Sequence, residues 1–476
     1  MLGMTFVALA VALVLGISFG RRSVRTPELY WALCGAGLVA TTAFMIGGYT
    51  WYDEVFLLGY VLANPPKLGG DSVRSPGGAW WAIFVIFCLY SIVEGIRGLI
   101  YFTDIGVGDP IQKFRWIALF VLILVVALKA KQLADSGVKP RDTAALITRA
   151  ALCFLILYLA VGVASFLSSG TFGNAQFAQT GVVTSGANPL VAVFSSTGYA
   201  TTVFLVVVPA ALICMCSRTP ARAALGALTV VLAFVSQVAY NSRTGMIYIL
   251  IGFVVYLVVR AATAQVRVLE VLMIPVMIAV PIAVTSQGET KLEHVITDLA
   301  ATLHLSEDPK ELQDVDRRIW FNASLDVLSA SDGLHSLFGY GSRTSGYEVS
   351  PYVTERFFVE AGKLKDTEDV AVESVTAIAV DNGYVGILLF GAISLGAMVI
   401  ALKSSRESRW LLFLIPVGVV VVLFVANVFD VALLYLTLMP FGLIYAMGRR
   451  DTNADDEATA DSSSVTASPS TQTANL

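Results

Sequence analysis

Apolar segments long enough to cross a lipid bilayer recur along the chain from Leu2 to Met447. A hydrocarbon core of about 30 Å takes roughly 20 residues of α-helix to cross. The segments are continuously apolar rather than alternating, which favours helices over the strands of a barrel. The pattern therefore predicts an all-α, polytopic integral membrane protein with 11 or 12 transmembrane helices. The first segment, Leu2 to Phe19, lacks the basic start and the cleavage site of a signal peptide, so we expect a retained helix.

Composition supports this class, because 56% of the residues are hydrophobic, 14% are charged and the mean hydropathy is +0.75. A soluble globular domain of this size does not have such values. Connectors rich in Lys and Arg stay in the cytoplasm; they begin at Lys129, Ser217, Arg260, Lys403 and Gly448. The alternate connectors are then external, and they include the short turn "YNSRTG" from Tyr240 and the segment 286–374. Arg243 lies in that short turn and breaks the positive-inside pattern.

The chain is thereby divided into four regions. Residues 1–285 are expected to form transmembrane helices with short connectors, although the topology of the first hundred residues stays open. Residues 286–374 form a long external loop, and residues 375–448 form the C-terminal transmembrane helices. Residues 449–476 are acidic and then rich in Ser and Thr, which is typical of a disordered cytoplasmic tail.

The long loop holds the polar residues that an enzyme at the membrane surface would use. It carries 17 Asp and Glu against 8 Lys and Arg, and all three histidines of the chain, His294, His304 and His335. The stretch "VDRRIWFNASLDVLSA", residues 315–330, places Val315, Ile319, Trp320, Ala323, Val327 and Leu328 at helical spacing. We therefore expect an amphipathic helix that lies on the bilayer surface or on the spans.

Three motifs follow one another on the external side. They are "SRTG" at 242–245, "RRIW" leading to a Gly-Tyr-Gly turn at 317–341, and "VESVTAIAVDNGYVG" at 372–386. Their order resembles the bacterial O-antigen polymerase and O-antigen ligase superfamily over residues 237–390. In that family similar motifs lie on the outer face of a polytopic transferase. Glu373-Ser374 stands where ligases commonly carry His-Asn, and this form is more similar to the polymerase branch.

The resemblance implies a metal-independent, inverting glycosyltransferase of GT-C type in the bacterial cytoplasmic membrane. It would join undecaprenyl-pyrophosphate-linked oligosaccharide repeat units, which serve as donor and acceptor, into an O-antigen, capsule or exopolysaccharide of the cell envelope. A chain-length regulator and a flippase are the protein partners it implies. No cofactor, metal or nucleic acid is expected.

The chemistry of this reaction selects the candidate residues. Arginine grips phosphate with two parallel hydrogen bonds, so Arg243, Arg317, Arg318 and Arg343 are candidates for binding the donor pyrophosphate, with Tyr340 as a further substrate contact. The acceptor hydroxyl must lose a proton to a base. Glu373, at the family position, is the first candidate, His335 the second and Asp381, about two helical turns after Glu373, the third. Simpler interpretations stay open: Arg243 could contact lipid headgroups, Glu373 could stabilise a helix N-terminus, and Asp381 could satisfy helix backbone or pair with an arginine.

Three other functions remain possible on the sequence alone. A ligase would transfer finished glycan to another acceptor. A metal-dependent transferase that uses polyprenyl-phosphate sugars would employ an acidic pair such as Asp53-Glu54. A transporter or flippase would rely on ionisable residues within spans, of which Arg149, Glu94 and Arg97 are the best examples.

Overall fold

The computed structural model of the chain is helical, and the part that it describes contains no strand. It describes residues 2–23, 52–65, 78–105, 197–240, 243–262, 315–342, 344–353, 374–404 and 408–425, with parts of 117–156 and 267–277. The prediction of an all-α protein is confirmed for these residues. His294, His304 and the tail from residue 449 lie outside them.

Four helices form a bundle around buried apolar side chains. They are α8 (Thr197–Met215), α9 (Pro220–Tyr240), α10 (Arg243–Ala262) and α18 (Arg409–Val425). Helix α8 contacts the other three. The hydroxyl of Tyr248 on α10 joins two of its neighbours, because it donates to the carbonyl of Leu205 at 3.0 Å and to that of Leu414 at 3.3 Å. Arg243, which we expected within a turn, is the first residue of α10.

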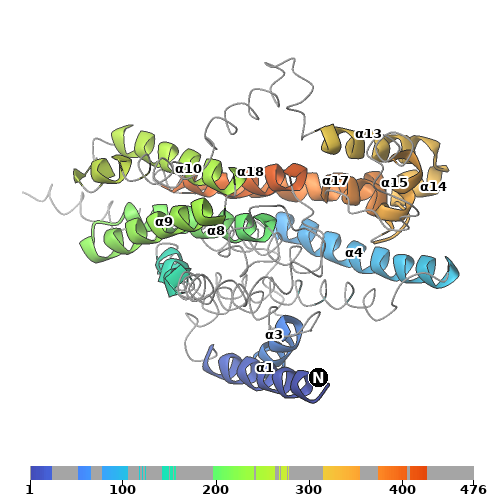
Figure 1. Ribbon diagram of the computed structural model, residues 1–476, viewed down its shortest axis with the longest axis horizontal. Coiled ribbons are helices and arrows are strands. Elements are labelled where there is room, and N and C mark those ends of the chain that lie inside the picture. The colour runs from blue at the N-terminus through green and yellow to red at the C-terminus, as the bar shows by residue number, and fades with distance from the viewer. Residues whose placement is uncertain are drawn as a thin grey trace, which may run out of the picture.

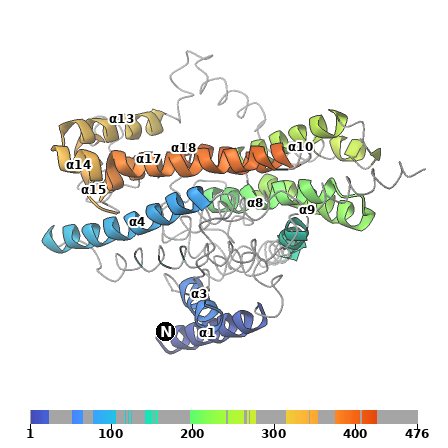
Figure 2. The same ribbon diagram turned by 180° about the vertical axis from the view of Figure 1, so that it is seen from behind.

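A second pair of helices runs from the bundle toward the opposite end of the molecule (Figures 1 and 2). These are α4 (Gly78–Ile105) and α17 (Ser374–Lys403), which lie antiparallel. Near the start of α4, the indole of Trp80 donates to the carbonyl of Ile393 at 2.8 Å. A Cβ atom on Gly396 would lie 2.2 Å from that indole, so this glycine makes room for the ring. The first half of α4 therefore packs along the second half of α17.

Helix α17 consists of two helical segments joined at Gly383, whose φ of 61° lies in the left-handed region. Glycine adopts this conformation without the steric cost that a Cβ atom brings. Three shorter helices gather at the end where α17 begins: α13 (Val315–Ala330), α14 (Gly333–Phe338) and α15 (Ser345–Val353) (Figure 1). Helix α13 has the bounds that its periodicity predicted, and Ala323, Val327 and Leu328 of its apolar face are buried.

Helices α1 (Leu2–Ser23) and α3 (Tyr52–Ala63) form a closely packed pair. A Cβ atom on Gly16 of α1 would lie 2.0 Å from the carbonyl oxygen of Phe56, and one on Gly20 would lie 2.6 Å from that of Tyr60. Two glycines four residues apart allow helix backbones to approach this closely, which is common in bilayers. The helix expected at the start of the chain is present, and its retention stays a prediction.

Four of the described helices contain segments long and apolar enough to cross a bilayer. These segments are Gly78–Tyr101, Pro220–Gln237, Gly245–Ala262 and Val375–Lys403. Their outward faces are apolar: Leu388 is 72% exposed and Val258 62% exposed. Apolar surfaces of this kind are rare on proteins surrounded by water, so the helices indicate a membrane protein. The total of 11 or 12 spans includes segments outside the described residues and stays a prediction.

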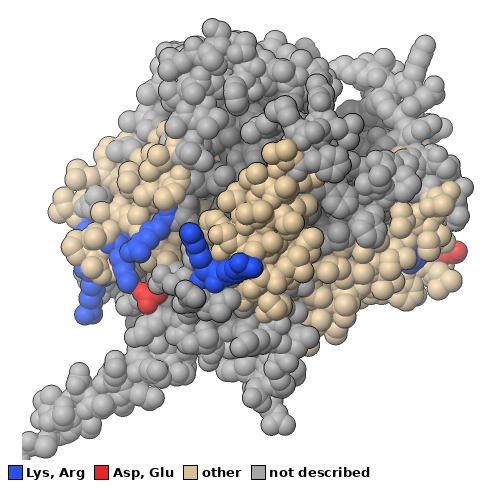
Figure 3. Space-filling model, turned by 90° about the horizontal axis from the view of Figure 1, so that it is seen from below, with Lys and Arg blue, Asp and Glu red and all other residues tan. Residues whose placement is uncertain are grey.

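Charged side chains divide between two ends of the helices. The end formed by the α8–α9 link, the end of α10 and the α17–α18 link is here called the basic end; it carries Arg218, Arg222, Arg260, Arg267, Lys403 and Arg409. Arg267 joins two of these segments, since it donates to the carbonyl of Ser217 at 2.8 Å. Seen from below, basic side chains lie toward the side of the molecule where α9 lies (Figure 3). The opposite end, with α13, α14 and α15, is called the loop end.

Candidate functional site at the loop end

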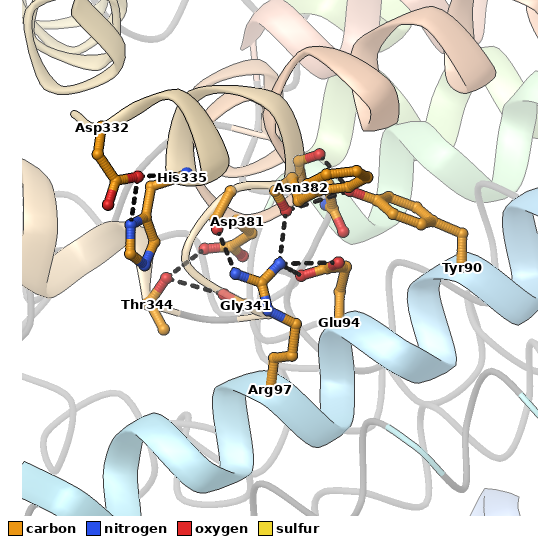
Figure 4. Close-up of polar contacts among 11 residues, drawn as sticks. Tyr90, Glu94, Arg97, Asp332, His335, Gly341, Thr344, Asp381 and Asn382 are labelled. Carbon is orange, nitrogen blue, oxygen red and sulfur yellow. Dashed lines mark hydrogen bonds and ion pairs between the residues drawn. The ribbon is translucent and has the colours of Figure 1, made fainter.

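The centre of the site is the turn Gly339-Tyr340-Gly341, which follows α14 and lies against the kink of α17. Both glycines have positive φ angles, 75° and 105°. The main-chain N–H of Tyr340 donates to the carbonyl of Val380 at 3.0 Å, and that of Gly341 donates to the carbonyl of Asp381 at 3.0 Å. Two of the three motifs found in the sequence are therefore in direct contact (Figure 4).

The turn and the kink satisfy each other's main-chain hydrogen bonds. Gly383 breaks the regular helix, and the carbonyls just before it bond outside α17 instead: Val380 and Asp381 accept from the turn, and Asn382 accepts from the hydroxyl of Tyr90 on α4 at 2.6 Å. At membrane depth, irregular backbone is tolerated only where protein or enclosed water satisfies it. The turn and the kink therefore form one structural unit.

An ion pair on α4 fixes the other side of the turn. Glu94 is buried and pairs with Arg97 at 2.8 Å. The same guanidinium donates to the carbonyl of Phe338 at 3.0 Å and to that of Gly339 at 2.8 Å. The main-chain N–H of Ser342 donates back to the carbonyl of Glu94 at 2.9 Å. Three elements distant in sequence, α4, the turn and α17, are thus joined by main-chain contacts.

Sequence reasoning missed the role of α4. Tyr90, Glu94, Arg97 and Tyr101 follow one another at intervals of four, three and four residues, so they share one face of the helix. All four contact residues of the loop end, and Tyr101 donates to the carboxylate of Glu348 on α15. Polar side chains at helical spacing within an apolar span were the signal that could have identified this face. Taken as isolated ionisable residues of a span, Glu94 and Arg97 indicate only a transporter.

Asp381, our third candidate for the base, is buried within this unit. One oxygen of its carboxylate accepts from the main-chain N–H of Ser345 at 2.7 Å and from the hydroxyl of Thr344 at 3.4 Å. Ser345 is the first residue of α15, where a carboxylate satisfies free N–H groups and the helix dipole. The carboxylate of Asp381 therefore holds the start of α15 in place.

His335, our second candidate, has a better position for proton transfer. Its Nδ1 atom lies 2.8 Å from a carboxylate oxygen of Asp332, and its ring stacks on Tyr340 at a centroid distance of 4.5 Å. The hydroxyl of Tyr340 in turn lies 2.7 Å from that of Ser331. The imidazole side chain remains 40% exposed. With Nδ1–H donating to Asp332, the Nε2 atom carries the lone pair that accepts a proton.

Asp332 acts on both the backbone and the side chain of His335. The same carboxylate oxygen accepts from the main-chain N–H of His335 at 2.8 Å, which caps the start of α14. These hydrogen bonds from the backbone and the ring of His335 lower the pKa of Asp332. The carboxylate is therefore ionised around neutral pH and available to orient the imidazole.

The remaining candidates are placed only in part. Arg243 begins α10, Arg317 and Arg318 lie in the first turn of α13, and Asp53 and Glu54 lie at the start of α3, but their side chains are outside the described part of the structure. Arg343 and Glu373 lie outside it altogether. The assignment of the arginines to the donor pyrophosphate and of Glu373 to the base therefore stays a prediction.

Within the described ranges, no group of three or more His, Cys, Asp or Glu side chains could hold a metal ion.

No protein-family model matches the chain, and the comparison with curated proteins gave no match.

Proposed function

We propose that the protein is a multi-pass enzyme of the bacterial cytoplasmic membrane that polymerises undecaprenyl-pyrophosphate-linked oligosaccharide units into a surface polysaccharide. The observation that supports this most directly is the contact between the Gly-Tyr-Gly turn and the Asp-Asn-Gly kink. These are the second and third motifs of the resemblance, and a chance likeness would give no reason for them to meet. The exposed His335 beside them supplies a proton acceptor.

The proposed orientation places the basic end in the cytoplasm and the loop end outside. It rests on the positive-inside rule and on the division of charge between the two ends of the helices. The apolar residues Leu334, Leu337 and Phe338 of α14 are exposed. Such a helix suits the boundary between lipid and water, where the sugar and the pyrophosphate of a lipid-linked substrate would also lie.

The proposed reaction is a direct displacement at the anomeric carbon of the donor sugar. The acceptor hydroxyl oxygen forms a bond to that carbon while the bond from the carbon to the pyrophosphate oxygen breaks, which inverts the anomeric configuration. The hydroxyl proton passes to Nε2 of His335 or to the carboxylate of Glu373. Undecaprenyl pyrophosphate departs as an anion, and Arg243 with Arg317 or Arg318 would compensate its charge.

The experiment that tests this function is deletion of the gene followed by gel electrophoresis of the surface polysaccharide. A polymerase leaves a single repeat unit in place of the ladder, and this is the expected result. Long polymer that is no longer attached would indicate a ligase instead, and an unchanged ladder would contradict both. In the complemented strain, Arg243→Lys should abolish the ladder while the protein still accumulates in the membrane. Glu373→Gln should abolish it if Glu373, rather than His335, is the base. Purified enzyme should remain active in chelator, whereas a metal-dependent transferase that uses Asp53 and Glu54 would not.

The pair Asp332 and His335 gives a separate prediction. His335→Ala should lower turnover of lipid-linked repeat units by roughly 10²-fold to 10⁴-fold, the range expected for general acid–base catalysis. Asp332→Ser should lower turnover as well, because serine caps α14 but does not orient the imidazole. The turnover of Asp332→Asn should lie between those of the wild type and Asp332→Ser, since the amide oxygen still accepts a hydrogen bond.

Turnover and KM are measured for each variant in lipid nanodiscs. A structural role for Asp332 would change thermal stability rather than turnover, and it would affect Asp332→Ser and Asp332→Asn alike. Full activity of His335→Ala would leave Glu373 as the base.

A further inference from the structure

Gln237, near the end of α9, is a buried polar side chain without a hydrogen-bond partner. Its exposed fraction is 0%, and neither the Nε2 nor the Oε1 atom has a partner. Other buried polar residues of the same helix are satisfied: the hydroxyl of Thr229 donates to the carbonyl of Leu225 at 2.8 Å, and that of Ser236 donates to the carbonyl of Ala233 at 2.7 Å. A buried amide with both ends unpaired is destabilising, and proteins retain few of them.

The amide of Gln237 points at the first turn of α10. A Cβ atom built on Gly245 would lie 1.7 Å from Oε1 of Gln237, so the amide occupies the space that any other residue at 245 would fill. Gly245 is the third residue of α10, and the first turn contains no acidic residue. The start of a helix presents main-chain N–H groups and a partial positive charge, which together favour a bound anion.

Gln237 and Gly245 lie at the same edge of the membrane-spanning segments. The apolar segments Pro220–Gln237 and Gly245–Ala262 have Gln237 and Gly245 as their limits. In the proposed orientation, this is the outer face of the membrane, at the level of the polar groups of a lipid. The first residue of the same helix is Arg243.

We propose that Gln237 and the first turn of α10 form a binding site for a phosphate ester that carries a neighbouring hydroxyl group. The Nε2 group donates to a phosphate oxygen, and Oε1 accepts from the hydroxyl, so one ligand satisfies both ends of the amide. A glycosyl pyrophosphate contains both groups, and its identification as the ligand rests on the proposed function. The site itself rests on the unpaired amide and on its place against α10.

The test uses Gln237→Met in the full-length protein, with Ser236→Ala as the matched control on the same helix. The probes are farnesyl pyrophosphate linked to N-acetylglucosamine and farnesyl pyrophosphate alone, each added to protein in phosphatidylcholine nanodiscs. A third arm replaces the phosphatidylcholine with phosphatidylglycerol, whose headgroup also contains a phosphate and hydroxyls. Binding is measured by the shift in melting temperature and by titration.

Without ligand, Gln237→Met should melt at a higher temperature than the wild type, because methionine removes the unpaired amide. The glycosyl probe should stabilise the wild type and Ser236→Ala, and its affinity for Gln237→Met should fall by roughly 10-fold to 100-fold, as for lost hydrogen bonds to a charged group. Farnesyl pyrophosphate alone should bind the wild type more weakly than the glycosyl probe. A response that depends on Gln237 only in phosphatidylglycerol would assign the site to a headgroup and overturn the glycosyl ligand.

Failure of the site and failure of the proposed function give different results. Equal affinity of the wild type and Gln237→Met for every probe, or no binding by the wild type, would overturn the site whatever the polysaccharide gel shows. Binding that depends on Gln237 in a protein whose deletion leaves the ladder unchanged would support the site and refute the polymerase.

Discussion

Arg97→Met is expected to lower the free energy of unfolding by about 3 kcal/mol, the lower end of the range for breaking a buried ion pair. The substitution leaves Glu94 buried without its cation and removes the donor to the carbonyl of Gly339. We take the lower end because the side chain of Arg97 is 33% exposed and because Glu94 can take up a proton. Thermal melting of purified protein in nanodiscs measures the change.

The double variant Glu94→Gln, Arg97→Met is the control for this result. It removes both charges, so no unpaired carboxylate remains, and we expect it to recover part of the loss. A single variant that melts like the wild type would show that Arg97 does not hold the turn. A double variant less stable than Arg97→Met would contradict the assignment of the loss to an unpaired Glu94.

Gly341→Ala should lower the free energy of unfolding at least as much as Arg97→Met does. Both the backbone conformation and the lack of space at this position exclude a side chain. The φ of Gly341 is 105°, and an added Cβ atom would lie 2.4 Å from the main-chain nitrogen of Gly98 and 2.8 Å from its Cα atom. Backbone of α4 cannot move aside as a flexible side chain does. We expect a loss of about 3 kcal/mol, from the sum of left-handed backbone strain and overpacking. The polysaccharide ladder should be lost with it.

Gly333→Ala and Gly391→Ala are matched controls for this prediction. Neither position would bring a Cβ atom within 4 Å of another group, and neither has a positive φ. Alanine is the better helix former, so each control should keep or slightly raise stability. If Gly341→Ala lost no more stability than the two controls, the close contact between the turn and α4 would not contribute to the stability of the fold.

Regular patterns of apolar residues allowed the helical parts of the fold to be predicted. The bounds of α13 follow from the spacing of Val327, Leu328 and the preceding apolar residues, and α17 begins where the polar loop was expected to end. The start of α10 at Arg243 was harder to predict, because a short run of polar residues between two apolar segments is also typical of a turn outside any helix. A helix can begin inside such a turn once its first N–H groups find other partners.

The candidate site was predictable only in its parts. From the sequence, His335, Tyr340 and Asp381 were candidates and Asp381 could satisfy helix backbone, but which helix it holds and the contact of Arg97 with the turn were not predictable. Local periodicity carries no information about contacts between residues so far apart in the chain. The kink at Gly383 was likewise hidden, because Asp-Asn-Gly looks the same in a turn and in a broken helix.

The separation of these partners along the chain also determines when they can meet during synthesis. The residues that Arg97 contacts in the turn are made 241 and 242 residues after it. At about 5–20 residues per second, this delay is on the order of 10–50 s. During that time α4 lacks the turn whose carbonyls Arg97 later contacts. Glu94 and Arg97 are three residues apart and pair within one helix, so insertion of α4 does not have to wait for the loop that it will later hold.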